Sequence, residues 1–114
     1  MQRLNLLILR CQDIESARTF YECIGMKFTK HAHGSGPEHY AHEDSSGVFE
    51  LYPVRPGHNG DATGLGFRTK DIQQLSREFE TGGFAPQPIQ DQPWGRTFIV
   101  RDPDGRRVEI KEEL

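Results

Sequence analysis

The pattern of apolar and polar positions occurs twice along the chain, at an offset of 58 residues. Each copy begins with an apolar run that alternates like a strand, continues with an Asp and apolar positions at helical spacing, and ends at a Gly. The copies are LRCQDIESARTFYECIGMKF at 9–28 and FRTKDIQQLSREFETGGFAP at 67–86. The pattern predicts a strand followed by a helix in each half.

Both predicted helices have suitable residues at their ends. Asp13 and Asp71 can cap the N-termini, because a carboxylate accepts hydrogen bonds from the first free amides of a helix. Gly25 and Gly83 can end the helices, because glycine readily adopts a left-handed conformation. The apolar stripes are predicted to contain Ile14, Ala17, Tyr21 and Ile24 in the first helix, and Ile72, Leu75 and Phe79 in the second.

Three short strand-like runs follow each helix and are separated by Gly, Ser and Pro. Each half is therefore predicted to be a βαβββ module. The fold class is α+β, with two tandem modules that form a concave mixed sheet lining a cleft. We expect a single domain over 1–114, with module 1 at about 1–54, a linker at 55–63 and module 2 at about 64–114. The runs are MKFTKHA (26–32), EHYAHED (38–44) and GVFELYP (47–53), then FAPQPIQ (84–90), RTFIVRD (96–102) and RRVEIKE (106–112).

The segment RDPDGRRVEI at 101–110 predicts a tight turn followed by a strand. Because strand side chains alternate, Val108 and Ile110 share the face that packs on the helix, and Glu109 points to the opposite face. The corresponding strand of the first module places Glu50 in the same way. The sequence therefore predicts two carboxylates at equivalent positions on the face that lines the cleft, with Arg10, Arg68, Arg101 and Arg107 as cations on that face.

Composition narrows the function classes. The net charge of −3 provides no basic surface for nucleic acid and no polybasic membrane anchor. No apolar run approaches the length of a membrane span, and the N-terminus does not read as a signal peptide. Cys11 and Cys23 form neither a disulfide framework nor a zinc motif. We expect a cytoplasmic protein that binds neither nucleic acid nor membrane.

Four of the five histidines lie in HAHGSGPEHYAHED at 31–44. Their spacing does not place them on one face, so chelation by the whole group is not expected, and most are predicted to be exposed beside a hairpin loop. His39 is the exception, because its strand is predicted to neighbour that of Glu50, where imidazole could bind a metal or exchange a proton. Tyr52 and Trp94 are candidates for the cleft rim, and ordinary packing is the alternative for both.

FYECIGMKF, GVFELYP and RDPDGRRVEI, in this order on paired βαβββ units, resemble the vicinal oxygen chelate superfamily. This group includes glyoxalase I, fosfomycin-resistance enzymes, extradiol dioxygenases and bleomycin-resistance proteins. The resemblance implies a homodimer and, in the enzymes, a divalent metal such as Ni, Zn, Mn or Fe. Its ligand positions fall on Glu50 and Glu109, and also on Leu6 and Gly64, which cannot bind metal. The resemblance therefore implies an incomplete metal site.

Three hypotheses follow from the residues and the resemblance. The leading one is a glyoxalase/bleomycin-resistance-like protein that binds a small molecule in its cleft, with lyase, isomerase or dioxygenase chemistry if the metal is present. The second is a metal-free protein that sequesters an antibiotic or metabolite, and the third is an accessory module without a ligand. The candidate residues are Glu50, Glu109 and His39 for catalysis, Glu50 and Glu109 for metal, and Arg10, Tyr52, Arg68 and Trp94 for substrate binding.

Overall fold

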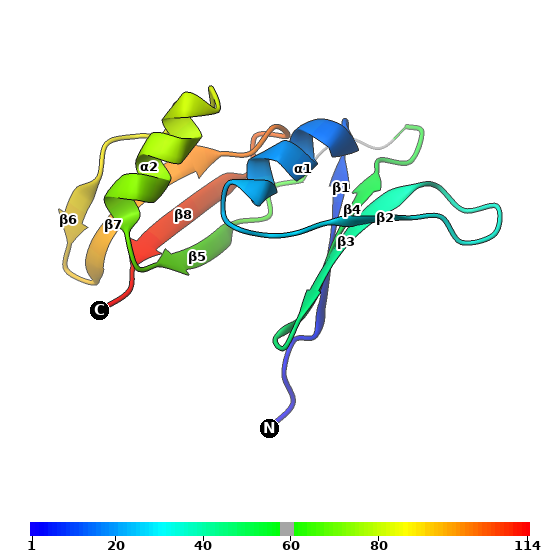
Figure 1. The fold of residues 1–114 in the computed structure, drawn as a ribbon, viewed down its shortest axis with the longest axis horizontal. Coiled ribbons are helices and arrows are strands. Elements are labelled where there is room, and N and C mark those ends of the chain that lie inside the picture. Colours follow the sequence, from blue (N-terminus) through cyan, green and yellow to red (C-terminus); the bar gives the residue numbers. More distant parts are fainter. Residues whose placement is uncertain (58–60) are drawn as a thin grey trace. The chain divides into compact units, whose positions relative to one another are not determined.

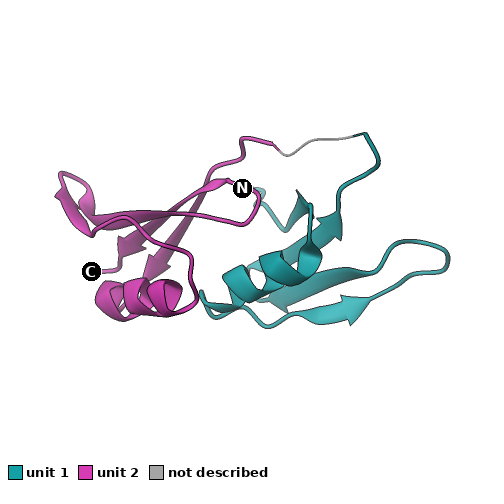
Figure 2. Cartoon of the chain, turned by 90° about the horizontal axis from the view of Figure 1, so that it is seen from above, with its two compact units in different colours: residues 1–60 teal, residues 61–114 magenta. Residues whose placement is uncertain are grey.

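A computed structural model describes residues 1–57 and 61–114, which form two compact units, 1–60 and 61–114 (Figure 2). Residues 58–60, within the predicted linker, lie outside the described residues. Each unit has one helix and four strands in the order βαβββ (Figure 1). Unit 1 contains β1 (Leu6–Cys11), α1 (Ile14–Glu22), β2 (Thr29–His31), β3 (His39–Asp44) and β4 (Gly47–Pro53). Unit 2 contains β5 (Leu65–Thr69), α2 (Ile72–Thr81), β6 (Gln90–Gln92), β7 (Gly95–Arg101) and β8 (Arg107–Glu112).

The two units have the same sheet topology. The strand orders are β1-β4-β3-β2 in unit 1 and β5-β8-β7-β6 in unit 2. The first strand of each unit pairs in parallel with the last, and the remaining pairs are antiparallel. The prediction of two tandem βαβββ modules with mixed sheets is confirmed.

The helix ends follow the predicted capping chemistry. The Asp13 carboxylate accepts hydrogen bonds from the amides of Glu15 and Ser16, and that of Asp71 accepts one from the amide of Gln74. Gly25 and Gly83 have φ values of 108° and 84°, which favour glycine over residues with a Cβ. One detail of the first stripe is wrong. The helix ends before Ile24, and Phe20 is fully buried although it was not included in the stripe.

The strand predicted at 84–90 is also placed wrongly, since β6 covers only Gln90–Gln92. Pro86 and Pro88 lack the amide hydrogens that a strand ladder requires. Ala85 has a φ of 50°, which is incompatible with extended backbone. The segment before β6 therefore runs without strand pairing, although the Gln87 amide donates to the carbonyl of Ile99 at 2.8 Å.

The turn before β8 delivers its strand as predicted. The Gly105 amide donates to the carbonyl of Asp102 at 2.8 Å, and Gly105 has a φ of 85°. In the strand that follows, Val108 and Ile110 are fully buried, whereas Glu109 is only partly covered. The alternation of faces that the sequence predicted for this strand is confirmed.

A buried arginine follows the same turn and was not anticipated. The Arg106 side chain is 0% exposed and donates to Asp61 through Nε at 2.9 Å and Nη2 at 3.0 Å. Its Nη1 donates to Asp102 at 3.1 Å and lies 3.7 Å from Asp104. Hydrogen bonds from Arg106 hold the pKa of Asp61 well below its ordinary value, and hydrogen bonds to Asp61 and Asp102 raise the pKa of Arg106 despite its burial. Through these hydrogen bonds Arg106 links Asp61 to Asp102, in the turn that precedes β8.

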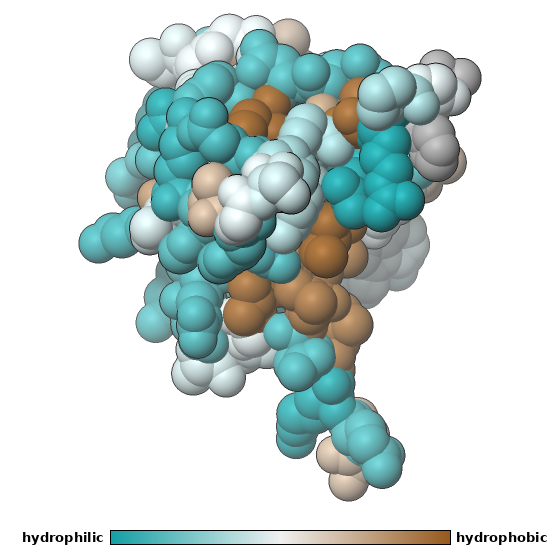
Figure 3. Space-filling model, turned by 90° about the vertical axis from the view of Figure 1, so that its right-hand side faces the viewer, coloured by the Kyte–Doolittle hydropathy of each residue, from teal (hydrophilic) through white to brown (hydrophobic). Residues whose placement is uncertain are grey.

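The exposed apolar residues of the first unit concentrate at its N-terminal strand. Leu4, Leu6 and Ile8 keep 78%, 45% and 39% of their surface exposed. Figure 3 shows apolar side chains gathered on one side of the molecule. Among the described residues, neither helix is long and apolar enough to span a bilayer.

Candidate ligand-binding site

Glu50 and Glu109 occupy equivalent positions in the two sheets. Glu50 on β4 is in register with Ile8 of β1 and Ala41 of β3. Glu109 on β8 is in register with Gly66 of β5 and Ile99 of β7. Both carboxylates alternate with buried apolar residues, so each lies on the sheet face opposite its helix. The predicted equivalence of the two strands is therefore present. The prediction that both carboxylates line one cleft stays a prediction.

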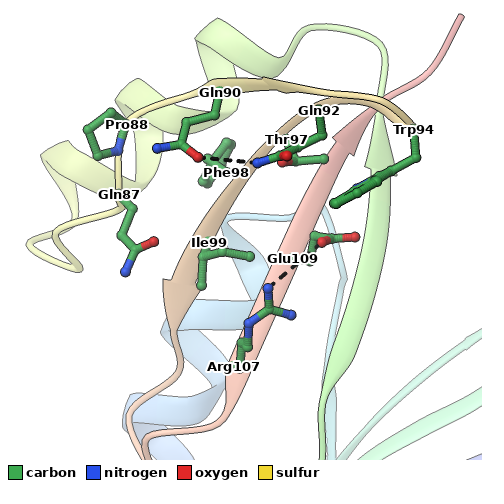
Figure 4. A pocket seen from close by; sticks show the side chains of 10 residues that line it. All are labelled: Gln87, Pro88, Gln90, Gln92, Trp94, Thr97, Phe98, Ile99, Arg107 and Glu109. Atoms are coloured by element: carbon green, nitrogen blue, oxygen red, sulfur yellow. Dashed lines mark hydrogen bonds and ion pairs between the residues drawn. The ribbon is translucent and has the colours of Figure 1, made fainter.

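Unit 2 has a pocket of about 200 Å³ around Glu109. Trp94, in the turn between β6 and β7, extends its ring over one side (Figure 4). Ile99 on β7 supplies apolar surface, and the segment before β7 closes another side with three glutamines. The lining residues are Gln87, Pro88, Gln90, Gln92, Trp94, Thr97, Phe98, Ile99, Arg107 and Glu109.

The polar groups of this pocket can bind a ligand in several ways. Arg107 Nη2 and Glu109 Oε2 are 4.0 Å apart, with 56% and 31% of their side chains exposed, so both retain surface for a ligand. Gln92 Nε2 donates to Gln90 Oε1 at 3.2 Å, which orients both amides. Thr97 also lines the pocket, although only 4% of its surface is exposed. A pocket with one indole, several amides and a loose ion pair suits an organic molecule with a flat ring and polar substituents.

The sheet of unit 1 holds the other predicted residues. His39 is 2% exposed, and its Nε2 lies 3.5 Å from Glu50 Oε2. Its ring stacks on Tyr52 at a centroid distance of 4.2 Å and an interplanar angle of 8°. The Arg10 guanidinium carbon lies 4.8 Å from the centroid of the Tyr52 ring. His39 thus lies beside Glu50, as the strand order suggested.

The remaining candidates lie within one unit or the other. Arg68 and Arg101 are exposed, and neither lines the pocket of unit 2. Arg101 donates through Nη1 to the carbonyl of Gly105 at 3.3 Å. His31 and His33 are exposed, as expected for most of this stretch. Trp94 joins Glu109 in unit 2, whereas Arg10, Tyr52 and His39 join Glu50 in unit 1.

The fourth histidine of this stretch, His42, is partly buried and contacts Asp44. Its Nε2 lies 3.0 Å from Asp44 Oδ2. The hydroxyl and the amide of Ser46 also donate to Asp44, at 2.6 and 2.8 Å. Together these hydrogen bonds lower the pKa of Asp44 to about 2, with the Ser46 hydroxyl as the largest cause. Asp44 is an exposed residue at the end of β3, so these contacts stabilise a local turn.

Two of the four residues at the superfamily's metal positions cannot bind a divalent cation. Glu109 faces the Arg107 guanidinium, and Glu50 faces His39. Leu6 provides no donor atom, and Gly64 has open space around its α-carbon. Within residues 1–57 and 61–114, no three His, Cys, Asp or Glu side chains are grouped to share a metal. Such a site usually supplies at least three protein ligands.

Sequence reasoning missed the glutamines of the pocket. Gln87, Gln90 and Gln92 were placed in or beside a strand whose position was wrong, and no motif marked them. Alternation along the true strand, Gln90–Gln92, would have grouped Gln90 with Gln92. The sequence would therefore have pointed to Gln90 and Gln92 only if the start of this strand had been predicted correctly.

The solved structures similar to this chain include TnmS3, an antibiotic binding protein from Streptomyces sp. CB03234. It is 21% identical with a TM-score of 0.81, and the match covers 100% of this chain and 98% of that chain. Oxidase ChaP-H2 is 17% identical with a TM-score of 0.78, covering 99% and 94%. Lactoylglutathione lyase from Agrobacterium tumefaciens is 17% identical with a TM-score of 0.69, covering 98% and 94%. At these identities the similarity shows a shared fold.

None of the curated proteins compared with the chain by sequence matches it. The profile of the Glyoxalase/Bleomycin resistance protein/Dioxygenase superfamily matches residues 3–110, nearly the whole chain. The resemblance inferred from the paired modules and the DPDG turn is thereby confirmed. The chain belongs to the Glyoxalase/Bleomycin resistance protein/Dioxygenase superfamily.

Proposed function

We propose that the protein binds a small organic molecule without a metal, and that the pocket around Glu109 takes part in this binding. The observation that carries the proposal is the pocket itself, which combines an exposed indole, amide groups and the Arg107–Glu109 pair. Trp94 is 54% exposed although it is a large aromatic residue. An exposed tryptophan at the rim of a polar pocket is suited to contact the flat face of a ligand.

The size of the pocket indicates how much of a ligand it holds. Sites for drug-sized molecules usually enclose about 300–1,000 Å³. The pocket of unit 2 has about 200 Å³. It therefore accommodates one ring with its substituents rather than a whole drug-sized molecule. We infer that the ligand presents one ring to Trp94 and hydrogen-bonding groups to Glu109 and the glutamines.

The comparison with TnmS3, an antibiotic binding protein, supports binding as a function that this fold can perform. The lack of suitable ligands for a metal supports the metal-free form of the proposal. In addition, Glu109 faces the cationic side chain of Arg107. A metal-dependent lyase, isomerase or dioxygenase, which the leading hypothesis included, has support from the folds of lactoylglutathione lyase and oxidase ChaP-H2 alone. An accessory module without a ligand is the third hypothesis.

The proposal predicts a saturable change in tryptophan fluorescence. Trp94 is the single tryptophan of the chain, so its emission reports on the pocket alone. We expect at least one member of a panel of aromatic antibiotics, including metal-free bleomycin, to quench or shift the emission equally with EDTA and with added nickel, zinc or manganese. Glu109→Gln should weaken that binding by about tenfold, because a hydrogen bond to a charged group is worth about 1.5–3 kcal/mol.

The matched control for this titration is Glu113→Gln, which changes an exposed carboxylate outside the pocket. It should bind like the unmodified protein. Binding that disappears with EDTA, together with about one retained transition metal per chain, would support the metal-dependent enzyme instead. A panel with no response would favour the accessory module.

We further propose that the protein is a homodimer. β1 and β5 are edge strands of their sheets, and Leu4, Leu6 and Ile8 expose apolar surface at β1. Exposed strand edges and contiguous apolar patches are usually covered in natural proteins. Sedimentation velocity should give the mass of two chains at micromolar concentration, and Leu6→Lys with Ile8→Lys should shift the protein towards one chain. A single-chain mass at high concentration would refute this proposal.

A further inference from the structure

We propose that the pocket of unit 2 recognises a neutral amide on its ligand, an aromatic carboxamide or lactam whose carbonyl oxygen faces Arg107 and whose N–H faces Glu109. This inference rests on the proposed function and names the chemical class of the ligand at the same site. It starts from the charges of the pocket. Of the ten described residues that line it, Arg107 and Glu109 carry charges of opposite sign, and the other eight are neutral.

The two charged side chains lie next to each other without forming a hydrogen-bonded ion pair. Arg107 and Glu109 are two positions apart on β8, so both side chains point to the same face of the sheet. Arg107 Nη2 lies 4.0 Å from Glu109 Oε2, which is beyond hydrogen-bond distance (Figure 4). Neither side chain is buried. Each group therefore has hydrogen-bonding capacity for a ligand.

A charged ligand group is poorly matched to this pair. A carboxylate would be attracted by Arg107 but repelled by the carboxylate of Glu109, and an ammonium or amidinium would be attracted by Glu109 but repelled by Arg107. A neutral amide avoids both repulsions, because its acceptor oxygen and its donor nitrogen share one carbon atom. It can accept from Arg107 and donate to Glu109 at the same time, and both hydrogen bonds are then strengthened by a charged partner.

The ring of the ligand has a separate contact. Trp94 lies in the turn between β6 and β7, and its ring extends towards the pocket (Figure 4). Ile99 of β7 is in register with Glu109 and adds apolar surface beside the charged pair. An aromatic ring can therefore stack on the indole while an amide attached to it reaches Arg107 and Glu109. The pocket volume of about 200 Å³ suits one such ring with its amide.

The neutral side chains of the pocket leave this charge balance unchanged. Gln92 Nε2 donates to Gln90 Oε1 at 3.2 Å, and neither amide adds a charge. The next residue on the same face of β8, Lys111, lies beside Gly95 and is not among the lining residues. One positive and one negative group at the pocket therefore determine which charge a ligand can bring.

The internal repeat shows that the fold does not require an arginine at position 107. Glu109 corresponds to Glu50, so Arg107 corresponds to Val48, which lies two positions before Glu50 on β4. Valine has no side-chain donor for a ligand. The arginine beside the carboxylate is thus a property of module 2 alone, as expected if it serves a ligand rather than the strand.

Four small probes with the same phenyl ring test this inference at neutral pH. Benzamide is neutral and has both a donor and an acceptor, acetophenone is neutral with an acceptor alone, benzoate is an anion and benzamidine is a cation. Each is titrated into ¹⁵N-labelled metal-free protein, and the indole N–H signal of Trp94 gives the dissociation constant. We expect benzamide to bind about tenfold more tightly than the other three, because only benzamide satisfies both charged groups.

Two substitutions should invert the preference. In Arg107→Met the remaining carboxylate should make benzamidine the tightest of the four probes, and in Glu109→Gln the remaining guanidinium should make benzoate the tightest. Benzamide should lose about tenfold in affinity in each variant, because one charged partner is missing. The matched controls are Arg77→Met, which removes an exposed arginine of α2, and Glu113→Gln, and both should keep the preference for benzamide.

The outcomes separate this inference from the proposed function. Equal dissociation constants for the four probes, or a charged probe as the tightest in the unmodified protein, would overturn the amide assignment and leave ring binding beside Trp94 intact. A preference for benzamide that survives both Arg107→Met and Glu109→Gln would do the same. If no probe shifts the Trp94 signal while an aromatic antibiotic does, the amide assignment alone is wrong. If neither the probes nor the antibiotic panel shift it, both proposals are wrong.

Discussion

Val108→Asp is expected to unfold the protein, while Glu109→Gln leaves its stability nearly unchanged. Val108 is fully buried on the helix side of β8, where its side chain contributes about 1.5–3 kcal/mol. A carboxylate there loses this contribution and adds a desolvation cost of several kcal/mol. The sum approaches the whole stability of a small domain, about 5–15 kcal/mol. Gln keeps the shape of Glu109 on the open face.

Urea unfolding followed by circular dichroism measures both changes. The expected result is no cooperative transition for Val108→Asp and a midpoint close to the original for Glu109→Gln. If both substitutions destabilise equally, Glu109 is a structural residue and its assignment to the ligand pocket is wrong. A stable Val108→Asp protein would contradict the strand register itself.

Arg106→Ala is expected to cost about 3–5 kcal/mol, because removing one partner of a buried ion pair leaves the other uncompensated. The Arg106 side chain is 0% exposed, and its partner Asp102 is also 0% exposed. The same substitution frees Asp61 from the turn. Arg106→Lys should recover only part of the loss, since an ammonium cannot reproduce the two hydrogen bonds to Asp61 together with that to Asp102.

The matched control is Arg107→Ala, which removes a neighbouring arginine that is 56% exposed. Its effect on the free energy of unfolding should stay within about 0.5 kcal/mol. Differential scanning calorimetry can compare the two variants directly. Equal melting temperatures for Arg106→Ala and Arg107→Ala would show that the buried cluster contributes no net stability.

The features that the sequence predicted correctly are local or repeated. Asp13 caps a helix through amides two and three residues away, and Gly25 has the positive φ that glycine permits just after a helix. The position of Glu109 follows from its neighbours in the same strand. The repeat then carried this reasoning to Glu50 without any knowledge of three-dimensional contacts. Each of these inferences depends on residues close in sequence or on the internal copy.

The features that were missed depend on contacts between distant residues. Arg106 was the first residue of the run predicted as a strand at 106–112, and nothing in the sequence marked it as buried or pointed to its contact with Asp61, 45 positions away. Gln90 and Gln92 became pocket residues because β6 begins later than the apolar pattern suggested, after two prolines. Composition and periodicity contain little information about such partners.

The central claim is that the pocket beside Trp94 and Glu109 binds an organic ring without a metal. The most direct test is ¹H–¹⁵N NMR of the metal-free protein during titration with the aromatic compound that changes Trp94 fluorescence. The proposal predicts that the indole N–H of Trp94 and the side-chain amides of Gln87, Gln90 and Gln92 shift together and saturate at one ligand per chain. Saturable shifts confined to residues outside this pocket, with these four signals unchanged, would contradict it.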